Sequence, residues 1–279
     1  MIVAHSIHHD LSGVFMRHTT VVLRVLAFGL TLGAASAASA QTATQDATGG
    51  NDVARPQEPG WGLGLGAGFS RSPYRGYGTK TSALPILLYN GAYFRVAGPA
   101  VDFKLGSVGQ FDFTLRAKYA DDGYKSGDAP ILNGMDERKD GFHLGGTATW
   151  RAPFAKFSLE WLKAAGNSNG QTVKLGAERG FTTGKVRLTP HLGVTWMNNE
   201  YVNYYYGVKS SEVTAARAAY NGKSTVNLDA GVRADYSLTT SQSVFLDLGV
   251  THYGSGITDS PLVDRSTSPS LRLGYVYKF

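Results

Sequence analysis

The feature that most limits how this chain can fold is the strict alternation of apolar residues at its carboxyl end. From position 271 onward every second residue is apolar, and the positions between them include Arg272, Gly274 and Lys278. A period of two residues is that of a β-strand, whose successive side chains point to opposite faces. One charge-free face and one cationic face suit a strand between membrane hydrocarbon and a wet lumen. The alternative is an edge strand of a soluble β-sandwich.

Hydropathy limits the ways in which the chain can cross a membrane. After position 40 there is no run of 18 apolar residues, and a transmembrane helix needs about 20. Without such helices, a chain spans a bilayer only as a closed β-barrel, because every backbone polar group must be paired internally. We therefore predict an all-β fold, a closed antiparallel transmembrane β-barrel with short periplasmic turns and longer extracellular loops.

The amino terminus has the pattern of an export signal. Arg17 and Arg24 precede an apolar run at 25–32, and small residues follow up to Ala40. A basic region, an apolar core and an A-x-A-like site predict a signal peptide over 1–40, with cleavage before Gln41 and a true start at Met16. The polar segment 41–60 predicts a disordered periplasmic leader, and 61–279 predicts the barrel.

Composition excludes several classes of protein. The chain has no cysteine, so it has no disulfide framework and no lipid-attachment cysteine behind the signal. The chain has a formal net charge of +6, and its basic and acidic residues alternate along the strands. This pattern indicates charges that line the lumen and the loops and not a nucleic-acid interface. We expect no cofactor and no metal, since the carboxylates at Asp121, Asp122 and Asp128 do not form an EF-hand pattern.

Alternation divides the mature chain into twelve strands. They are predicted at 61–70, 82–89, 92–97, 100–106, 110–119, 141–150, 155–162, 171–181, 185–197, 225–236, 243–252 and 270–279. A barrel with both termini in the periplasm needs an even strand number, and the predicted connections alternate between short and long as that requires. The exception is the third outer connection, a Gly98-Pro99 turn, so the hairpin over 92–106 is the weakest part of the prediction.

Charges fall on one face of these strands, which predicts a charged lumen. The inward set comprises Asp112, Arg116, Lys118, Glu160, Lys174, Glu178, Arg187, Asp229, Arg233 and Asp247. A cation that faces lipid at mid-bilayer costs about 2 to 4 kcal/mol, and the predicted outward sets contain none. Mixed signs predict either a salt-bridged plug or a conducting lumen. We favour the plug, because twelve strands are fewer than the 16 to 18 of open porins.

Two outer loops carry more than turn residues. The ninth, 198–224, supplies the partner-binding candidates Tyr201, Asn203, Tyr204, Tyr205, Tyr206, Gly207, Glu212 and Tyr220, which could equally form an interfacial aromatic girdle. Ser210 and Ser211, followed by an acid and alanines, predict a short surface helix there. In the fifth loop, residues 136–140 predict either an ion-pair network or, as we favour, a solvated tip.

Several of these segments resemble the MipA/OmpV family of outer-membrane proteins. The resemblance rests on 201–212, 134–138, the segment Ser260-Pro261-Leu262-Val263-Asp264 and the terminal 275–279, and it extends over about 61–279. It implies a barrel without known catalytic residues. The best-known member is a scaffold joining a murein lytic transglycosylase to a bifunctional murein synthase, which is a penicillin-binding protein. Other members are adhesins or antibiotic-responsive proteins. Site candidates of the loop network are Asp136, Arg138, Ser260, Pro261 and Asp264.

The chain end also resembles the signal that the barrel-assembly machinery recognises, with Tyr275, Tyr277 and Phe279 as its residues. We expect the assembly machinery and outer-membrane lipid as partners, and localisation in the outer membrane. Three functions remain open: a non-enzymatic scaffold in peptidoglycan assembly, a small channel, and a lipid-acting barrel hydrolase. The last is disfavoured, because His143, His191 and His252 are each followed two positions later by glycine and not by the serine of barrel lipases.

Overall fold

The structure, a computed structural model, describes residues 60–279. The predicted signal peptide, the start at Met16 and the leader lie outside these residues, except that Gly60 begins the first strand. The strands are β1 (Gly60–Arg71), β2 (Thr79–Asn90), β3 (Phe94–Ala97), β4 (Ala100–Val108), β5 (Phe111–Ala120), β6 (Gly141–Arg151), β7 (Lys156–Ala165), β8 (Gln171–Glu178), β9 (Phe181–Thr183), β10 (Val186–Met197), β11 (Thr225–Ser237), β12 (Gln242–His252) and β13 (Thr267–Lys278).

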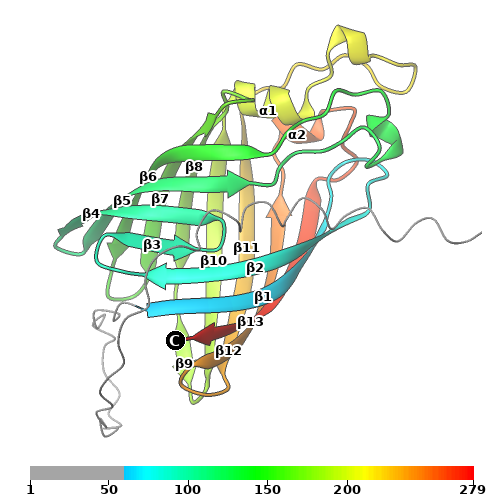
Figure 1. Cartoon of the computed structure of the whole chain (residues 1–279). Coiled ribbons are helices and arrows are strands. Elements are labelled where there is room, and N and C mark those ends of the chain that lie inside the picture. Colours follow the sequence, from blue (N-terminus) through cyan, green and yellow to red (C-terminus); the bar gives the residue numbers. More distant parts are fainter. Residues whose placement is uncertain (1–59) are drawn as a thin grey trace, which may run out of the picture. The chain divides into compact units, whose positions relative to one another are not determined.

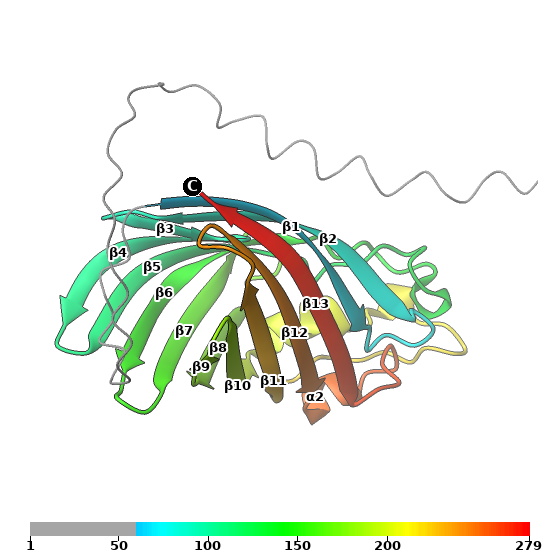
Figure 2. The ribbon, with the colours of Figure 1, turned by 90° about the horizontal axis from the view of Figure 1, so that it is seen from below.

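The strands form one antiparallel sheet that closes on itself. Strands adjacent in sequence are paired around the sheet, and β1 pairs with β13 to complete the ring. The strands β8 and β9 both pair with β10, so together they count as one interrupted strand of the wall. The barrel is therefore twelve-stranded. Closure and the predicted count of twelve are both confirmed. Figures 1 and 2 show this ring from the side and from below.

The interruption between β8 and β9 lies opposite a proline. The Pro190 carbonyl accepts a hydrogen bond from the Arg179 N–H at 3.2 Å, so Pro190 faces this neighbour. Proline has no N–H to donate to the ladder. The pairing consequently stops at Glu178 and resumes at Phe181.

The hairpin of β3 and β4, the weakest prediction, is present but uneven. Only four residues of β3 pair, and β4 carries a bulge between Lys104 and Gly106. The Tyr119 N–H of β5 donates to the Pro99 carbonyl at the hairpin tip at 3.0 Å. Because of the short β3, the outer half of β2 is left without a strand on that side.

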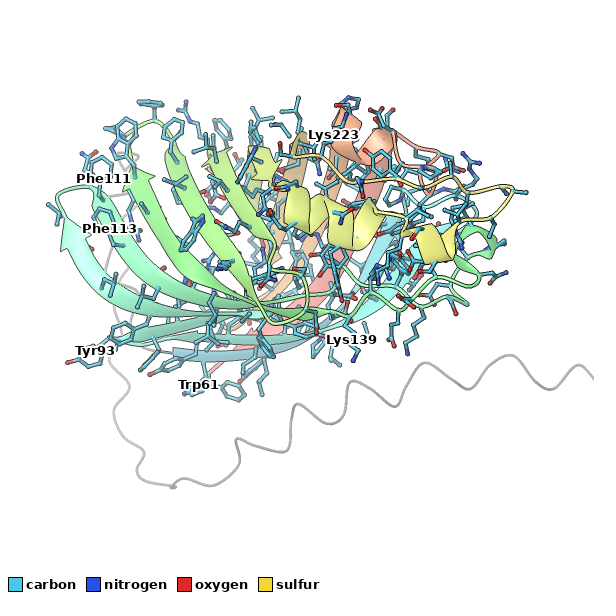
Figure 3. All side chains as sticks on the ribbon, turned by 90° about the horizontal axis from the view of Figure 1, so that it is seen from above. Trp61, Tyr93, Phe111, Phe113, Lys139 and Lys223 are labelled. Carbon is cyan, nitrogen blue, oxygen red and sulfur yellow. The ribbon has the colours of Figure 1, made fainter. Side chains whose placement is uncertain are left out.

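The outer face of the barrel is apolar and aromatic. Leu65 is 74% exposed and Val108 is 72% exposed, as suits side chains whose solvent is hydrocarbon. Trp61, Tyr93, Phe111 and Phe113 project away from the ribbon in Figure 3. The strand β7 runs three residues past its predicted end, which places Lys163 beside the outward Leu144 at the loop end. A lysine there can extend its ammonium to the headgroup region.

Glycines on the inner face of β1 permit the close approach of β13 at the seam. A Cβ on Gly64 would lie 2.2 Å from the Tyr275 carbonyl oxygen, and one on Gly66 would lie 2.5 Å from that of Leu273. Real Cβ atoms do not come this close to backbone, so only glycine fits these two positions.

The two ends of the barrel differ. We call the end with the short connections the turn end, and the end with the long connections the loop end. At the loop end lie α1 (Asn199–Tyr206), α2 (Ser255–Thr258) and the 3-10 turns η3 (Pro130–Leu132) and η4 (Ser210–Glu212). Within residues 60–279, no helix is long and apolar enough to span a membrane. By the rule for bacterial barrels, the turn end faces the periplasm.

Candidate functional site

Four loops at the loop end pack into one body, which we call the cap. It consists of 72–78, 121–140, 198–224 and 253–266. Its core contains Tyr74, Tyr124, Ala129, Leu132, Met135, Val202, Val208, Ile257, Leu262 and Val263. Leu132, Val202, Ile257 and Leu262 are fully buried, which no side chain of the strands matches except Asp102. Loops that bury apolar side chains in this way are folded structure and not solvated connections.

The helix α1 forms because its start is capped and one of its faces is buried. The Asn198 side chain accepts a hydrogen bond from the Tyr201 N–H at 3.0 Å. Tyr201, Val202 and Tyr205 lie on the buried face, as residues spaced by one and four positions can. The predicted helix after Ser210 was wrong. That segment forms only η4 and then a tight bridge between Thr214 and Arg217.

The tyrosines of the ninth loop bind the cap together. The Tyr74 hydroxyl donates to the Tyr205 carbonyl at 3.0 Å, and the Tyr74 ring stacks on Tyr206 with 5.4 Å between centroids. The Tyr201 hydroxyl donates to Asp122 at 2.8 Å. Burial raises the pKa of Tyr74, Tyr201 and Tyr206 well above 10, and raises that of Tyr124 to about 12. All four are therefore neutral at physiological pH.

A buried ion pair joins the fifth loop to the ninth. The Arg138 guanidinium donates to both carboxylate oxygens of Glu212 at 2.9 Å, and the two side chains are 4% and 2% exposed. The backbone N–H groups of Lys209 and Asp136 also donate to Glu212. The prediction of a solvated tip at 136–140 was therefore wrong for Arg138, which belongs to an internal network.

The electrostatics of Glu212 follow from this set of donors. Burial alone raises the pKa of the carboxyl group. The two backbone N–H groups and the Arg138 guanidinium outweigh burial, so the pKa of Glu212 lies below its ordinary value of 4.5. The charged pair is consequently the stable form at neutral pH.

Other candidates from the sequence also enter the cap. They are joined there by Arg217, which the sequence did not single out and which donates to backbone carbonyls of Glu212 and Asn133. The Ser260 hydroxyl donates to the Tyr206 carbonyl at 2.7 Å, and the Tyr220 hydroxyl donates to that of Gly256 at 2.9 Å. Thus the three segments 134–138, 201–212 and 260–264, which are distant in sequence, meet in one place.

Few of the partner-binding candidates are accessible. Tyr201, Tyr205, Gly207 and Glu212 are buried, whereas Asn203 is exposed and Tyr204 and Tyr206 are partly so. Tyr204 and Asn203 help to line an open depression of about 440 Å³ on the outside of the cap, together with Glu137, Glu200 and Lys209. In the ion pairs of this region, Asp136 binds Lys209 at 2.7 Å on the surface, and Asp264 lies 3.6 Å from Arg265. Pro261 precedes the buried Leu262.

The predicted lumen charges form clusters of mixed sign. Arg116 binds both Asp102 and Glu160, and Lys118 lies 3.5 Å from Glu160. Lys174 binds Asp229 at 2.9 Å. Asp247 lies 3.5 Å from His191 and 3.4 Å from Arg272. Asp102, which is 1% exposed, was missed by sequence reading because its strand belongs to the uneven hairpin.

The remaining inward charges lie near the turn end. Asp112 binds Arg151, Glu178 binds Lys156 at 2.5 Å, and Arg233 binds Asp235 at 2.8 Å. Arg187 is exposed there. The aromatic residues of the chain end, Tyr275, Tyr277 and Phe279, lie on the outer face and are 38%, 38% and 75% exposed.

Part of the lumen wall is apolar, which sequence reading also missed. Leu84, Ile86 and Leu88 pair with glycines of the inner face of β1 and are half-buried. Both faces of β2 are apolar over 83–89, so alternation there does not show which face is inside. Strand pairing was needed to place these side chains.

The described part of the structure places the histidines singled out from the sequence and contains no candidate metal cluster. Within residues 60–279, no group of three or more His, Asp or Glu side chains could hold a metal ion. His143 is 5% exposed in the upper lumen, with its ring 6.3 Å from that of Tyr201. His252 contacts Thr267 at 3.2 Å.

Comparisons with known proteins agree with the barrel and extend over most of it. The family described as MltA-interacting protein MipA matches residues 63–279. The protein YiaT of Escherichia coli (strain K12) is 28% identical over 225 residues, which are 78% of this chain and 90% of that protein. The MltA-interacting protein of the same strain is also 28% identical over 225 residues, 78% of this chain and 89% of that protein.

Two further similarities are more distant. The outer membrane protein OmpV of Vibrio cholerae is 27% identical over 157 residues, 56% of this chain and 61% of that protein. Among solved structures, an outer membrane channel from Pseudomonas putida F1 has 13% sequence identity and a TM-score of 0.43, and the match covers 84% of this chain and 100% of that one.

Proposed function

This chain belongs to the MipA family of MltA-interacting proteins, and from that premise we propose that it is a non-enzymatic interaction protein of the outer membrane. Its partners are periplasmic murein enzymes, a lytic transglycosylase and a bifunctional penicillin-binding protein, which it holds at its turn end. A relative named MltA-interacting protein supports this class of partner.

The observation that carries the proposal is the packed cap. Its aromatic and ionic side chains are used within the protein, in contacts such as Arg138 with Glu212 and Tyr74 with Tyr205. A loop end that is folded upon itself suits a stationary barrel better than an open pore. The face left for partners in the periplasm is then the turn end.

The charge of the turn end indicates what kind of surface it would attract. Nine basic residues lie at its turns and adjoining strand positions, against five acidic residues at the same levels, Asp102, Asp112, Glu178, Asp235 and Asp247. The basic residues are Arg95, Lys104, Arg151, Lys156, Arg179, Lys185, Arg187, Arg233 and Lys278. Arg179, Lys185, Arg187 and Lys278 have no ion-pair partner in the part of the chain that the structure describes. The excess of basic residues gives the turn end a positive electrostatic potential, which attracts an acidic surface on a partner and speeds its association.

Site-directed photo-crosslinking in intact cells tests this proposal. A photoreactive amino acid at Thr183 or Thr239, both exposed and at short turns, is expected to capture a murein transglycosylase and a penicillin-binding protein. The same amino acid at Lys139 or Lys223, on the loop side in Figure 3, serves as the matched control and should capture neither. Failure to capture either enzyme from the turn end, in cells that express both, contradicts the proposal.

Charge reversal then tests the electrostatic part. Lys185→Glu with Arg187→Glu should reduce capture several-fold, and the loss should shrink as salt is raised. Lys139→Glu with Lys223→Glu, of the same charge change at the loop end, should leave capture unchanged. An equal loss of capture in both double variants would show that the partners do not recognise the charge of the turn end.

A second candidate, a small channel, is favoured by one observation. The side chains of Lys174 and Arg272 point into the lumen and are 42% and 56% exposed. The lumen is therefore not fully packed. Conductance across a planar bilayer distinguishes this function from that of an interaction protein.

A further inference from the structure

The wall of the barrel has a gap in its hydrogen bonding beside β2. β2 pairs with β1 along its whole length, but with β3 only over Leu88–Asn90. The Leu87 carbonyl accepts a hydrogen bond from the Gly98 N–H at 3.1 Å, so Leu87 directs its backbone toward β3. By the alternation of a strand, Thr81, Ala83 and Pro85 face the same side. Among residues 60–279, these three have no backbone partner on that side.

The identity of residue 85 agrees with an unpaired edge. Proline has no N–H for a ladder, and inside sheets it is confined to edges, strand starts and bulges. In Figure 1, β2 continues past the end of β3. The gap is bounded below by the Pro99 tip, which binds Tyr119, and above by the ion pair of Lys80 and Asp121 at 2.8 Å. We call this the wall gap.

An open edge in a membrane barrel needs a reason. Backbone groups that face hydrocarbon without partners cost several kcal/mol each, and closure normally removes every edge. The side chains of Thr81 and Pro85 lie on the lipid face, because they pair with the outward Phe69 and Leu65. The gap lies toward the start of β2, which is next to the loop end, and the loop end of a bacterial barrel faces outward from the cell. It therefore faces the outer leaflet.

The lumen side of the same wall carries an apolar trough. Leu84, Ile86 and Leu88 lie opposite Gly66, Gly64 and Gly62 of β1, so no side chain of β1 stands between them and β13. Val276 on β13 flanks Gly64 from the other side. The Phe245 ring lies over Gly274. We call these five apolar side chains the trough.

The trough is not part of a packed core. Leu84, Ile86, Leu88 and Phe245 are half-buried, whereas Val276 is 5% exposed, and the buried cluster of the molecule lies in the cap and includes none of the five. The Arg233 guanidinium lies over the Phe245 ring at 4.0 Å from its centroid. Apolar side chains that line a wet lumen are unfavourable unless something apolar covers them. Four positions along β2 at about 3.3 Å each give a length of about 13 Å. That length and the apolar lining fit a single acyl chain.

A cation stands at the loop-side end of the trough. The stem of Arg272 lies over Gly68, beside the tip of Leu84. Its side chain is 56% exposed, and its guanidinium lies 3.4 Å from Asp247, which also lies 3.5 Å from His191. An added carboxylate would therefore find an accessible cation at this end.

We propose that the trough binds the acyl chain of a fatty acid, which enters from the outer leaflet through the wall gap and places its carboxylate beside Arg272. This site is independent of the turn end, and the interaction proposed above can fail without affecting it. The wall gap accounts for access, and the half-buried apolar side chains of the trough account for the affinity for an acyl chain. Arg272 accounts for the preference for an anionic headgroup.

Photolabelling of the protein in lipid nanodiscs tests the site. The probe is a twelve-carbon fatty acid that carries a diazirine near its methyl end, and adducts are located by mass spectrometry. We expect adducts at the half-buried trough residues Leu84, Ile86, Leu88 and Phe245, competed by excess laurate. Adducts confined to outward residues such as Leu63 and Leu87, without competition, would overturn the proposal.

A matched pair of variants checks the route. Ile86→Trp fills the trough and should reduce laurate-competed labelling at least ten-fold. Leu87→Trp places the same ring on the lipid side of the same strand and should leave labelling unchanged. If Ile86→Trp does not fold, the positions of the adducts in the unaltered protein still decide the question.

The headgroup is tested separately. Arg272→Gln should weaken competition by laurate about ten-fold and leave competition by its methyl ester unchanged. Equal effects on the acid and the ester would contradict the role of Arg272, and effects on neither would do the same.

Discussion

At the scale of single residues, the contact that most governs the cap is the buried pair of Arg138 and Glu212. Removal of one partner leaves the other charge buried without compensation, which costs about 3 to 5 kcal/mol. We therefore expect Glu212→Gln to loosen the cap while the barrel stays folded. Hydrogen exchange should speed at the amides of 134–138 and 201–212 and stay slow in β5 and β10.

The surface pair of Lys209 and Asp136 provides the control. Its side chains are 61% and 65% exposed, and solvent screens such surface pairs so that they contribute little to stability. Lys209→Gln should leave exchange in the cap nearly unchanged. If both variants behave alike, burial does not set the strength of the Arg138 contact.

The same residue predicts how the cap responds to acid. The pKa of Glu212 is lower in the folded cap than in an unfolded chain, so the charged carboxylate stabilises the cap above the ordinary value of 4.5. That contribution is lost as pH falls below 4.5 and through the lowered pKa. Limited proteolysis of the cap should therefore accelerate below pH 4.5. In Glu212→Gln, the acid-dependent step should be smaller, and an unchanged step would assign it to other carboxylates.

At the scale of elements, the strands could be predicted from sequence and the helix could not. A period of two is written into each strand, because lipid on one side and the lumen on the other impose opposite chemistries on alternate residues. The helix α1 depends instead on Asn198 as its cap and on a buried face supplied by other loops. Ser210 and Glu212 imitate a helix start, yet Glu212 is held by Arg138 from the fifth loop.

Asn198, the N-cap residue of α1, gives a prediction for this helix. The Asn198 side chain accepts from the N–H groups of Tyr201 and Gln171 at 3.0 and 2.8 Å, so it joins α1 to β8. Asn198→Ala removes both bonds and should lower the stability of the cap by about 1 to 2 kcal/mol. Asn198→Asp keeps the acceptor and should retain most of that stability. Hydrogen exchange at Val202 and Asn203 measures the difference, and equal exchange in the two variants would show that the acceptor is not what matters.

At the scale of the whole molecule, sequence patterns establish the ring but not what fills its ends. Alternation and the lengths of the connections depend only on residues close in sequence. Closure and the count of twelve strands could therefore be predicted. The cap joins residues such as Arg138 and Glu212, which lie 74 positions apart. The trough needs the register that sets Ile86 opposite Gly64. Neither relation leaves a periodic trace in the sequence.

Whether the cap closes the lumen is a question for conductance. We expect the unaltered protein to give little current in planar bilayers, because folded loops cover the loop end and the lumen charges are paired across the wall, as Arg116 is with Glu160. Replacement of 199–223 by a short Gly-Ser linker removes α1 and Glu212, and Arg138→Gln in the same variant avoids an unpaired buried charge. This variant should show frequent openings of larger amplitude.

The contributions of the cap and of the paired lumen charges to closure can then be separated. If the shortened variant stays closed, the mixed charges of the lumen are the barrier, and Lys174→Ala with Asp229→Ala should open it without any net change in charge. If the unaltered protein already conducts steadily, the cap is no plug and the channel function gains over the interaction function. Because the turn end is untouched in every one of these variants, capture of murein enzymes should persist in all of them.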